Sequence, residues 1–309
     1  MSAAPRAYPA GPVTFVSAAP PGGGWHQICV KTADALRAEG LVPAGIEVVV
    51  TPGGLAVFEQ TIAARRGDDR TLIAFSPGLT MQILMKGSRH SYADITPIAA
   101  LSTDYGALVA HPGSPISTLP ALIDTLRRRP AEVPIAGGSG PGAMHHGMVS
   151  VVAAAAGVPA AAVPYLGQGG VAEALRSVRT GQAPVAALGA ADVLGEVREG
   201  RLRVLAVLAE RRLPELPDAP NAREQGLDVV FPMWRGFYGP PAMPARAVAF
   251  WSETFTRLCR TPTWGRVLRE SNWFPLLLVG EAFRAFLQED TRRYAGALLR
   301  AGIGREATT

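Results

Sequence analysis

The chain has 309 residues, a length that favours two domains or one large domain. Hydrophobic residues make up 48% and charged residues 18%, so the chain can bury a full core and is not intrinsically disordered. The net charge of +5 comes from arginines scattered in short pairs, with no basic stripe interleaved with aromatic residues, which excludes a nucleic-acid-binding face. Apolar stretches are too short or too broken by glycine and proline to span a membrane.

Strand-like and helix-like runs alternate through the first hundred residues. The pattern predicts strands over 13–18, 46–51 and 72–75, and helices over 25–39, 56–65 and 79–85. Alternation of this kind is typical of βαβ units and of a mostly parallel sheet.

A second alternating series begins near Tyr105, and the chain becomes largely helical after a Gly-Pro-Pro turn at 239–241. The expected strands are 107–110, 133–136, 162–165, 184–188 and 202–208; the expected helices are 119–128, 145–156, 171–179, 245–258, 263–270 and 281–300. Two such series and a helical tail predict an α/β fold of two lobes with a cleft between them.

Four strand-to-helix junctions are candidate binding sites, and three of them are rich in glycine. They lie at 20–26, 137–143, 167–170 and 189–192. A helix N-terminus has unpaired N–H groups and a partial positive charge, and glycine lets the backbone approach a ligand closely. Since α/β sheets bind ligands at the carboxyl ends of their strands, these junctions predict a cleft for a small anion.

Several more specific interpretations fail. No junction matches the P-loop pattern, and the relaxed dinucleotide fingerprint from Gly138 to Ala143 lacks the acidic residue that should follow within 158–165. Neither Ser76 nor Ser139 fits a nucleophile elbow. His145 and His146 point about 100° apart on a helix, which is unfavourable for a shared metal. We therefore expect no cofactor and no metal, while a hydrolase in which a histidine and a serine meet in space stays open.

Four segments together resemble the solute receptors of tripartite tricarboxylate transporters, also called Bug-type receptors. Residues 20–27 are similar to the family pattern PxGGGWDQ, and residues 137–147 to a GGSxGGxDH stretch. Residues 200–226 are similar to GKLRxLAV followed by PTxxEqG, and the fourth segment is Trp234-Arg235-Gly236 with Pro240-Pro241. The four segments follow one another in family order and spacing over about residues 12 to 290.

The resemblance implies a type II periplasmic-binding-protein fold with a discontinuous first lobe, 1–104 plus 231–309, and a second lobe, 105–230. The two lobes would close on a di- or tricarboxylate, held by backbone amides of the first two Gly-rich junctions. Such a receptor is not an enzyme: it works in the periplasm and delivers its ligand to the membrane permease subunits of the transporter. We expect a monomer without cofactors.

The candidate ligand-binding residues lie in the junctions and after one strand. They are Gly22, Gly23, Gly24, Trp25, His26, Ser76, Ser139, Gly140, Gly142, Ala143, His145, Gly167, Gln168, Gly169 and Asp192.

Two of these residues depart from the family pattern. His26 and His145 stand where the motifs have Asp, and His146 takes the position of the motif's His. If the two rings face the ligand, they replace acceptors with donors or cations and favour ligands with two or three carboxylates; otherwise the rings turn away. The alternative function is a hydrolase-like α/β enzyme that uses His26 or His145 with a serine.

Three questions stay open at this level. Spacing does not decide whether Cys29 and Cys259 pair. Either Trp234 and Phe237 pack where the chain returns to the first lobe, or Trp234 or Arg235 faces the cleft. The segment before Val13 has no apolar signal-peptide core, so the protein is either cytoplasmic or a chain that begins after a removed signal, and the resemblance favours the latter.

Overall fold

The computed structural model describes residues 8–303, which form two compact units. Unit 1 contains the residues up to Ser76, residues 89–103 and residues 234–289; unit 2 contains residues 77–88, 104–233 and those from Asp290 on. Two segments, 77–88 and the one from Asp290 on, thus belong to unit 2, whereas we expected both in the first lobe.

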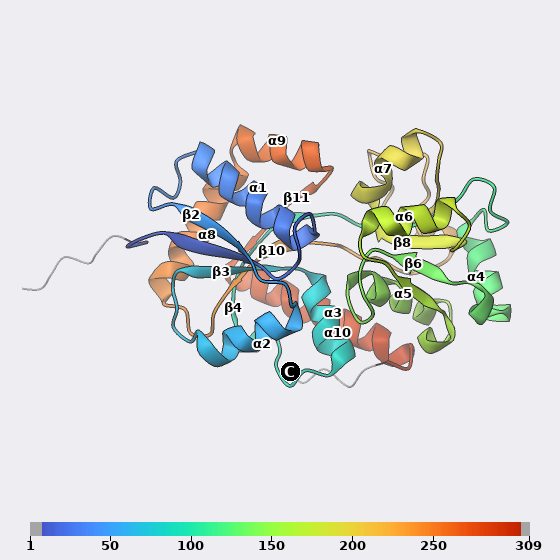
Figure 1. Cartoon of the computed structure of the whole chain (residues 1–309), viewed down its shortest axis with the longest axis horizontal. Helices are drawn as coiled ribbons and strands as arrows, with labels where there is room; N and C mark the ends of the chain where they lie inside the picture. The colour runs from blue at the N-terminus through green and yellow to red at the C-terminus, as the bar shows by residue number, and fades with distance from the viewer. Residues whose placement is uncertain (1–7, 304–309) are drawn as a thin grey trace, which may run out of the picture. The chain divides into compact units, whose positions relative to one another are not determined.

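Unit 1 is built on a six-stranded sheet of order β11-β4-β10-β3-β1-β2 (Figure 1). Its strands are β1 (Val13–Ser17), β2 (Ile46–Val50), β3 (Thr71–Phe75), β4 (Thr96–Thr103), β10 (Arg235–Gly239) and β11 (Phe274–Val279). Its helices are α1 (Gly24–Ala38), α2 (Leu55–Ala64), α8 (Ala245–Cys259), α9 (Pro262–Ser271) and the first part of α10 (Gly280–Arg300), with a short 3-10 helix η1 (Tyr92–Asp94). Helix α1 packs on β1, β2 and β3 and against α9, as Figure 1 shows.

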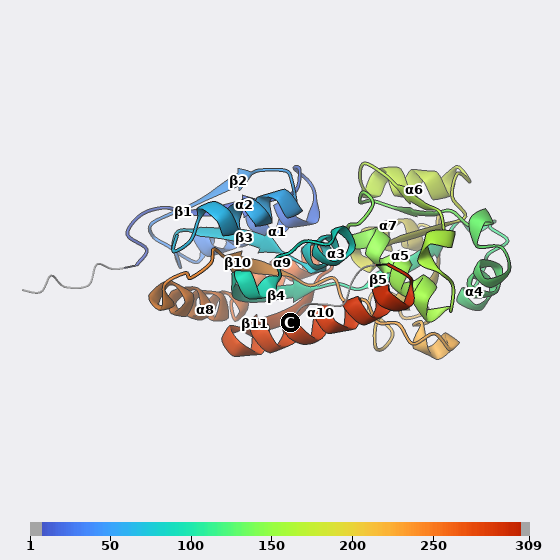
Figure 2. The same ribbon diagram turned by 90° about the horizontal axis from the view of Figure 1, so that it is seen from below.

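Unit 2 contains a five-stranded sheet of order β7-β6-β8-β5-β9. Its strands are β5 (Gly106–Ala110), β6 (Ile135–Gly137), β7 (Tyr165–Gly167), β8 (Val185–Gly189) and β9 (Arg203–Leu208). Its helices are α3 (Pro77–Lys86), α4 (Leu119–Arg128), α5 (Met144–Ala155), α6 (Val171–Arg179), α7 (Ala190–Arg198) and the end of α10, with 3-10 helices η2 (Pro130–Glu132), η3 (Ala160–Ala162) and η4 (Arg223–Gln225). The continuous course of α10 is visible in Figure 2.

Both sheets are mixed, which corrects the expectation of mostly parallel sheets. Strand β1 is parallel to β2 and β3, and β6 is parallel to β7 and β8. In contrast, β10 is antiparallel to both β3 and β4, and β5 is antiparallel to both β8 and β9. The α/β class is confirmed, but β10 and β11 run opposite to the other strands of the first sheet, and β5 runs opposite to the other strands of the second.

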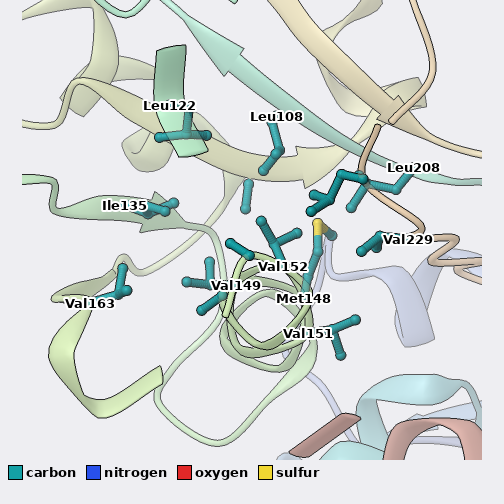
Figure 3. Packing of buried hydrophobic residues seen from close by; sticks show 14 of the residues in the cluster. Leu108, Leu122, Ile135, Met148, Val149, Val151, Val152, Val163, Leu208 and Val229 are labelled. Atoms are coloured by element: carbon teal, nitrogen blue, oxygen red, sulfur yellow. The ribbon is translucent and has the colours of Figure 1, made fainter. Parts of the chain in front are cut away.

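The core of unit 2 forms around α5, which places Met148, Val149 and Val152 against the sheet (Figure 3). Central strands β5 and β8 are buried at every position, as expected for strands covered on both faces. The last turns of α10 join this core through the fully buried Tyr294 and Leu298.

Local sequence explains where several helices begin. The Thr118 side chain caps α4 by accepting the N–H of Ala121, with proline in the first turn. Thr261 caps α9 in the same way through Trp264. Helices α1 and α5 begin differently: glycine and alanine stand at their N-caps, and neither N-cap residue has a side chain that accepts a hydrogen bond. These two helix starts coincide with the first two candidate junctions.

Candidate ligand-binding turns

The first Gly-rich junction, turn A (residues 19–26), connects β1 to α1. Gly22 has a positive φ of +83°, and Gly23 is the extended N-cap residue of α1. The N–H of Gly22 donates to Nδ1 of His26 at 3.2 Å, and the carbonyl of Gly22 accepts from Nε2 of Gln27 at 2.9 Å. The turn is therefore closed by side chains of the helix that it starts.

Turn A is also tied to the neighbouring strand. Nε1 of Trp25 donates to Oγ of Ser76 at 2.7 Å, and Ser76 is only 3% exposed. Ser76 directly follows β3, and because β1 and β3 are parallel neighbours, their carboxyl ends meet at this edge. The structure thus brings two of the predicted residues, Trp25 and Ser76, into contact, while the ring of His26 bonds within turn A.

The second junction, turn B (residues 139–146), connects β6 to α5 in unit 2. Gly142 has a φ of +75°, and its N–H donates to Nδ1 of His146 at 2.9 Å. Oγ of Ser139 accepts the backbone N–H of His145 at 3.0 Å, and the carbonyl of Ser139 accepts the hydroxyl of Tyr165 at 2.5 Å. The Tyr165 ring stacks on His146 with centroids 4.6 Å apart.

Turns A and B have the same build, although they belong to different units. Gly22 corresponds to Gly142 at positive φ, and His26 corresponds to His146 as the imidazole that accepts the glycine N–H. The sequence motifs paired His26 with His145 instead. His145 is 7% exposed, and the geometric counterpart of His26 is the following residue.

The imidazoles of both turns act as hydrogen-bond acceptors at Nδ1. An accepting Nδ1 carries no proton, so in this arrangement the ring is neutral with its proton on Nε2. Burial lowers the pKa of His146 from 6.5, which favours the neutral ring. These contacts close a turn, and they differ from the nucleophile–base contact that the hydrolase alternative requires.

The first-turn N–H groups of α1 and α5 have no acceptor within the helix, and in α5 the N–H of His145 already donates to Oγ of Ser139. In α1 they belong to Gly24, Trp25 and His26, and neither helix has an acidic residue in its first turn. The N–H of Ala143, in contrast, donates within turn B to the carbonyl of Gly140 at 3.2 Å. Both helix starts therefore keep the positive partial charge that attracts an anion.

The third junction, which includes the predicted Gly167, Gln168 and Gly169, differs in charge. Helix α6 has Glu173 in its first turn, and the Gln168 side chain donates to Oγ of Ser177 at 3.0 Å rather than extending from the junction. The backbone N–H of Gln168 donates to Gly137 at 2.8 Å, so this segment supports the strand that leads into turn B.

The fourth junction already contains two carboxylates. Asp104, which is fully buried, accepts the N–H of Ala191 at 3.2 Å, and Asp192 accepts the N–H of Gly189 at 3.3 Å. Protein side chains thus take the place that an anion would take at the start of α7. Asp192, a predicted ligand-binding residue, has a capping role here.

The cysteines and the metal search complete the description of reactive groups. Cys29 and Cys259 are both free thiols, which answers the question of pairing, and burial raises the pKa of each to about 12. Among residues 8–303, no group of three or more His, Cys, Asp or Glu side chains could hold a metal ion. In the same range, no helix combines the length and the apolar character that a membrane crossing needs.

Two α/β units with helix starts of positive partial charge are the architecture that the resemblance to solute receptors implies. The TctC family model, described as tripartite tricarboxylate transporter family receptor, matches residues 38–302. The chain therefore belongs to this family, which confirms the resemblance.

Individual relatives are distant but cover nearly the whole chain. BugT of Bordetella pertussis is 24% identical over 300 residues, covering 96% of this chain and 90% of BugT. Among solved structures, Rpa4515 of R. palustris with adipate has a TM-score of 0.81 at 20% identity, covering 96% of this chain and 99% of that one. MatC of Rhodopseudomonas palustris with bound malate has a TM-score of 0.77 at 21% identity, covering 94% and 99%. At these identities the structural likeness establishes the fold.

Proposed function

We propose that this protein is a periplasmic solute-binding receptor that captures a small di- or tricarboxylate and delivers it to a tripartite-type membrane permease. The ligand carboxylates bind to first-turn N–H groups of α1 and α5. The receptor works without catalysis or cofactor, as a monomer. The cleft between two lobes that the resemblance implies stays a prediction.

One observation carries this proposal: of the four candidate junctions, only turns A and B start helices without a first-turn acid. The adipate and malate bound to Rpa4515 and MatC support the same ligand class. The Nδ1 contacts in both turns hold the backbone in place, so binding needs no change of the loop.

A ligand screen tests the proposal directly. Purified protein is unfolded and refolded to remove any bound molecule, and thermal shifts are recorded with malate, succinate, adipate, citrate, glutamate and aspartate. The dissociation constant of the most stabilising acid is then measured by calorimetry. Mass spectrometry of any molecule that co-purifies identifies the natural ligand. A protein that none of these acids stabilises, and that co-purifies with no carboxylate, contradicts the proposal.

Proline at the first helical position removes single donors without breaking a helix, because this position has no intrahelical acceptor. The variants are Gly24→Pro and Met144→Pro. The preceding residues, Gly23 and Ala143, already have the extended backbone that a residue before proline prefers. Loss of one hydrogen bond to a charged group weakens binding by about 10- to 100-fold.

Two controls accompany these variants. Ala245→Pro makes the same change at the first position of α8 and should leave affinity unchanged. Gly24→Ala adds a side chain but keeps the N–H, which separates steric effects from donor loss. Equal affinity in both turn variants and in the α8 control would show that these N–H groups do not bind the ligand.

A further inference from the structure

Tyr165, the first residue of β7, contacts turn B at both of its ends. Its hydroxyl donates to the carbonyl of Ser139, the first residue of the turn, at 2.5 Å. Its ring stacks on His146, the last residue of the turn, with 4.6 Å between the centroids and 20° between the ring planes. Tyr165 therefore ties the turn to a strand outside it, and the proposed function above does not use this residue.

Two glycines on adjacent strands make room for the tyrosine ring. Strands β6 and β7 are parallel neighbours, with Ile135 opposite Tyr165 and Gly137 opposite Gly167. A Cβ at Gly137 would lie 2.5 Å from Oη and 2.8 Å from Cε2 of Tyr165, and a Cβ at Gly167 would lie 3.2 Å from Cε1. Since residues two apart on a strand share a face, the ring crosses the places that two side chains would otherwise fill. The path of the ring from β7 to turn B depends on both glycines.

The tyrosine side chain suits this position because it is rigid and keeps its proton. Burial raises the pKa of Tyr165 to about 12, so the hydroxyl stays protonated and donates at neutral pH. A tyrosine side chain has two rotatable bonds, and here both the ring face and the hydroxyl have a partner. One side chain thus fixes two points of turn B.

The two residues that Tyr165 contacts also shape the start of α5. Oγ of Ser139 accepts the N–H of His145 at 3.0 Å, and Nδ1 of His146 accepts the N–H of Gly142 at 2.9 Å. A displaced Ser139 or a rotated His146 ring would change these hydrogen bonds and the direction of the neighbouring backbone N–H groups. Because a binding group must lie within about 0.5 Å of its productive position, such a displacement weakens binding.

We infer that Tyr165 is a positioning residue for ligand binding: from β7 it holds turn B in the conformation in which the start of α5 binds a carboxylate. This inference rests on the proposed function and concerns unit 2 alone. Tyr165 acts through Ser139 and His146 and does not touch the ligand. Its loss lowers the fraction of molecules whose turn is ready to bind, so the affinity for every carboxylate falls by the same factor.

Two variants and one matched control test the inference. Tyr165→Phe removes the hydroxyl and keeps the stacked ring, whereas Tyr165→Leu removes both contacts. The control is Tyr294→Phe, which removes a hydroxyl that donates to the carbonyl of Pro232 at 3.2 Å in the same unit. Tyr294 packs on Phe231, and neither of these partners is part of turn B. Calorimetry at pH 7.5 gives the dissociation constants of malate, succinate, adipate and citrate for the wild type and each variant.

Tyr165→Phe should bind each acid that the wild type binds about 3- to 10-fold more weakly, because one neutral hydrogen bond is lost. Tyr165→Leu should bind more weakly still, by a factor that is again the same for every acid. Tyr294→Phe should keep the affinity of the wild type, although it loses a hydrogen bond of the same kind.

Amide hydrogen exchange, followed by NMR in the ligand-free protein, reports on the turn itself. The N–H groups of Gly142 and His145 should exchange about 3- to 10-fold faster in Tyr165→Phe and faster again in Tyr165→Leu. Gly22, whose N–H makes the corresponding contact in turn A, is the internal control and should exchange at the same rate in every variant. A purely structural role would instead speed exchange throughout unit 2.

The outcomes separate the two proposals. Equal affinities of Tyr165→Phe and Tyr294→Phe, unchanged exchange at Gly142, or faster exchange throughout unit 2 overturns this inference and leaves the proposed function standing. A factor that differs between acids also overturns it, because the hydroxyl would then contact the ligand. A wild type that binds no carboxylate overturns both. If Tyr165→Leu does not fold, Tyr165→Phe decides alone, since it lacks only one oxygen atom.

Discussion

Nδ1 of His26 and Nδ1 of His146 make the same contact in two different units, each accepting the N–H of the glycine four residues earlier, at 3.2 and 2.9 Å. In a capping box, an acidic or amide side chain at the third helical position accepts an N–H at the start of the helix. Here an imidazole takes this role, and it does so without placing a negative charge beside the first-turn N–H groups.

The His146 contact predicts an acid-sensitive stability. Burial lowers the pKa of His146 in the folded chain, so near pH 6.5 the unfolded chain binds the proton more readily. This contribution to the free energy of unfolding is fully present above about pH 6.5 and is lost as the pH falls below it. His146→Asn keeps an acceptor that does not titrate. Urea unfolding between pH 7.5 and 5.5 should show a steeper loss for the wild type than for this variant, and parallel profiles would contradict the prediction.

Gly142 should be far less tolerant of substitution than Gly140, two residues away in turn B. Gly142→Ala places a side chain at a φ of +75° and 3.3 Å from Cε of Lys86, whereas a Cβ at Gly140 meets nothing within 4 Å. A left-handed conformation costs a non-glycine residue about 1–2 kcal/mol. Chemical denaturation should therefore show a loss of about this size for Gly142→Ala and almost none for Gly140→Ala. Equal losses would mean that the turn accommodates a side chain freely.

The hydrogen bond between Trp25 and Ser76 should be measurable as a coupling energy. A double-mutant cycle of Trp25→Phe and Ser76→Ala isolates the bond from the rest of the packing. A neutral hydrogen bond with a buried partner contributes about 0.5–1.5 kcal/mol, so the coupling should fall in that range. Strictly additive losses would show that the 2.7 Å contact contributes nothing to stability.

Asp104 should be important for the stability of unit 2. Its carboxylate is fully buried and accepts the N–H of Ala191 at the start of α7. Asp104→Asn removes the charge but keeps the shape, and we expect a loss of about 1–3 kcal/mol in urea unfolding. Asp124→Asn, an exposed substitution on α4, is the matched control and should change the free energy of unfolding by less than about 0.5 kcal/mol. A neutral Asp104→Asn would contradict the capping role.

Most helices and strands could be predicted from the spacing of hydrophobic residues and from the residues typical of turns, because both patterns are regular in the βαβ part of the chain. Helices α4 and α6 begin and end at the predicted residues. Strands β4, β10 and β11 were missed because each breaks a local rule. Two contain proline, at Pro97 and Pro275, and β10 contains Gly236, where a Cβ would lie 1.9 Å from the carbonyl oxygen of Ala99. Their antiparallel pairing depends on partners distant in sequence, which a local pattern does not contain.

For the candidate site, the positions of the turns could be predicted from the sequence, but the hydrogen bonds that their side chains make could not. Glycine followed by a helix is a local signal, and it identified turns A and B. Whether an imidazole faces a ligand or closes its own turn depends on rotamers, and the pairing of His26 with His146 depends on three-dimensional geometry. The carboxylate of Asp104 reaches α7 from 87 residues away, so no motif could show that the fourth junction was already occupied.

Helix α10 determines when unit 2 can be completed during synthesis. The helix contributes to unit 1 up to Glu289 and to unit 2 from Asp290 on, where Tyr294 and Leu298 lie in the core of unit 2. The N–H of Ala160 also donates to the carbonyl of Ala301 at 3.1 Å. A chain that emerges from the ribosome at roughly 5–20 residues per second therefore leaves this core open until residues 290–301 have emerged. Removal of that segment would leave apolar surface uncovered in a unit whose other residues are all present.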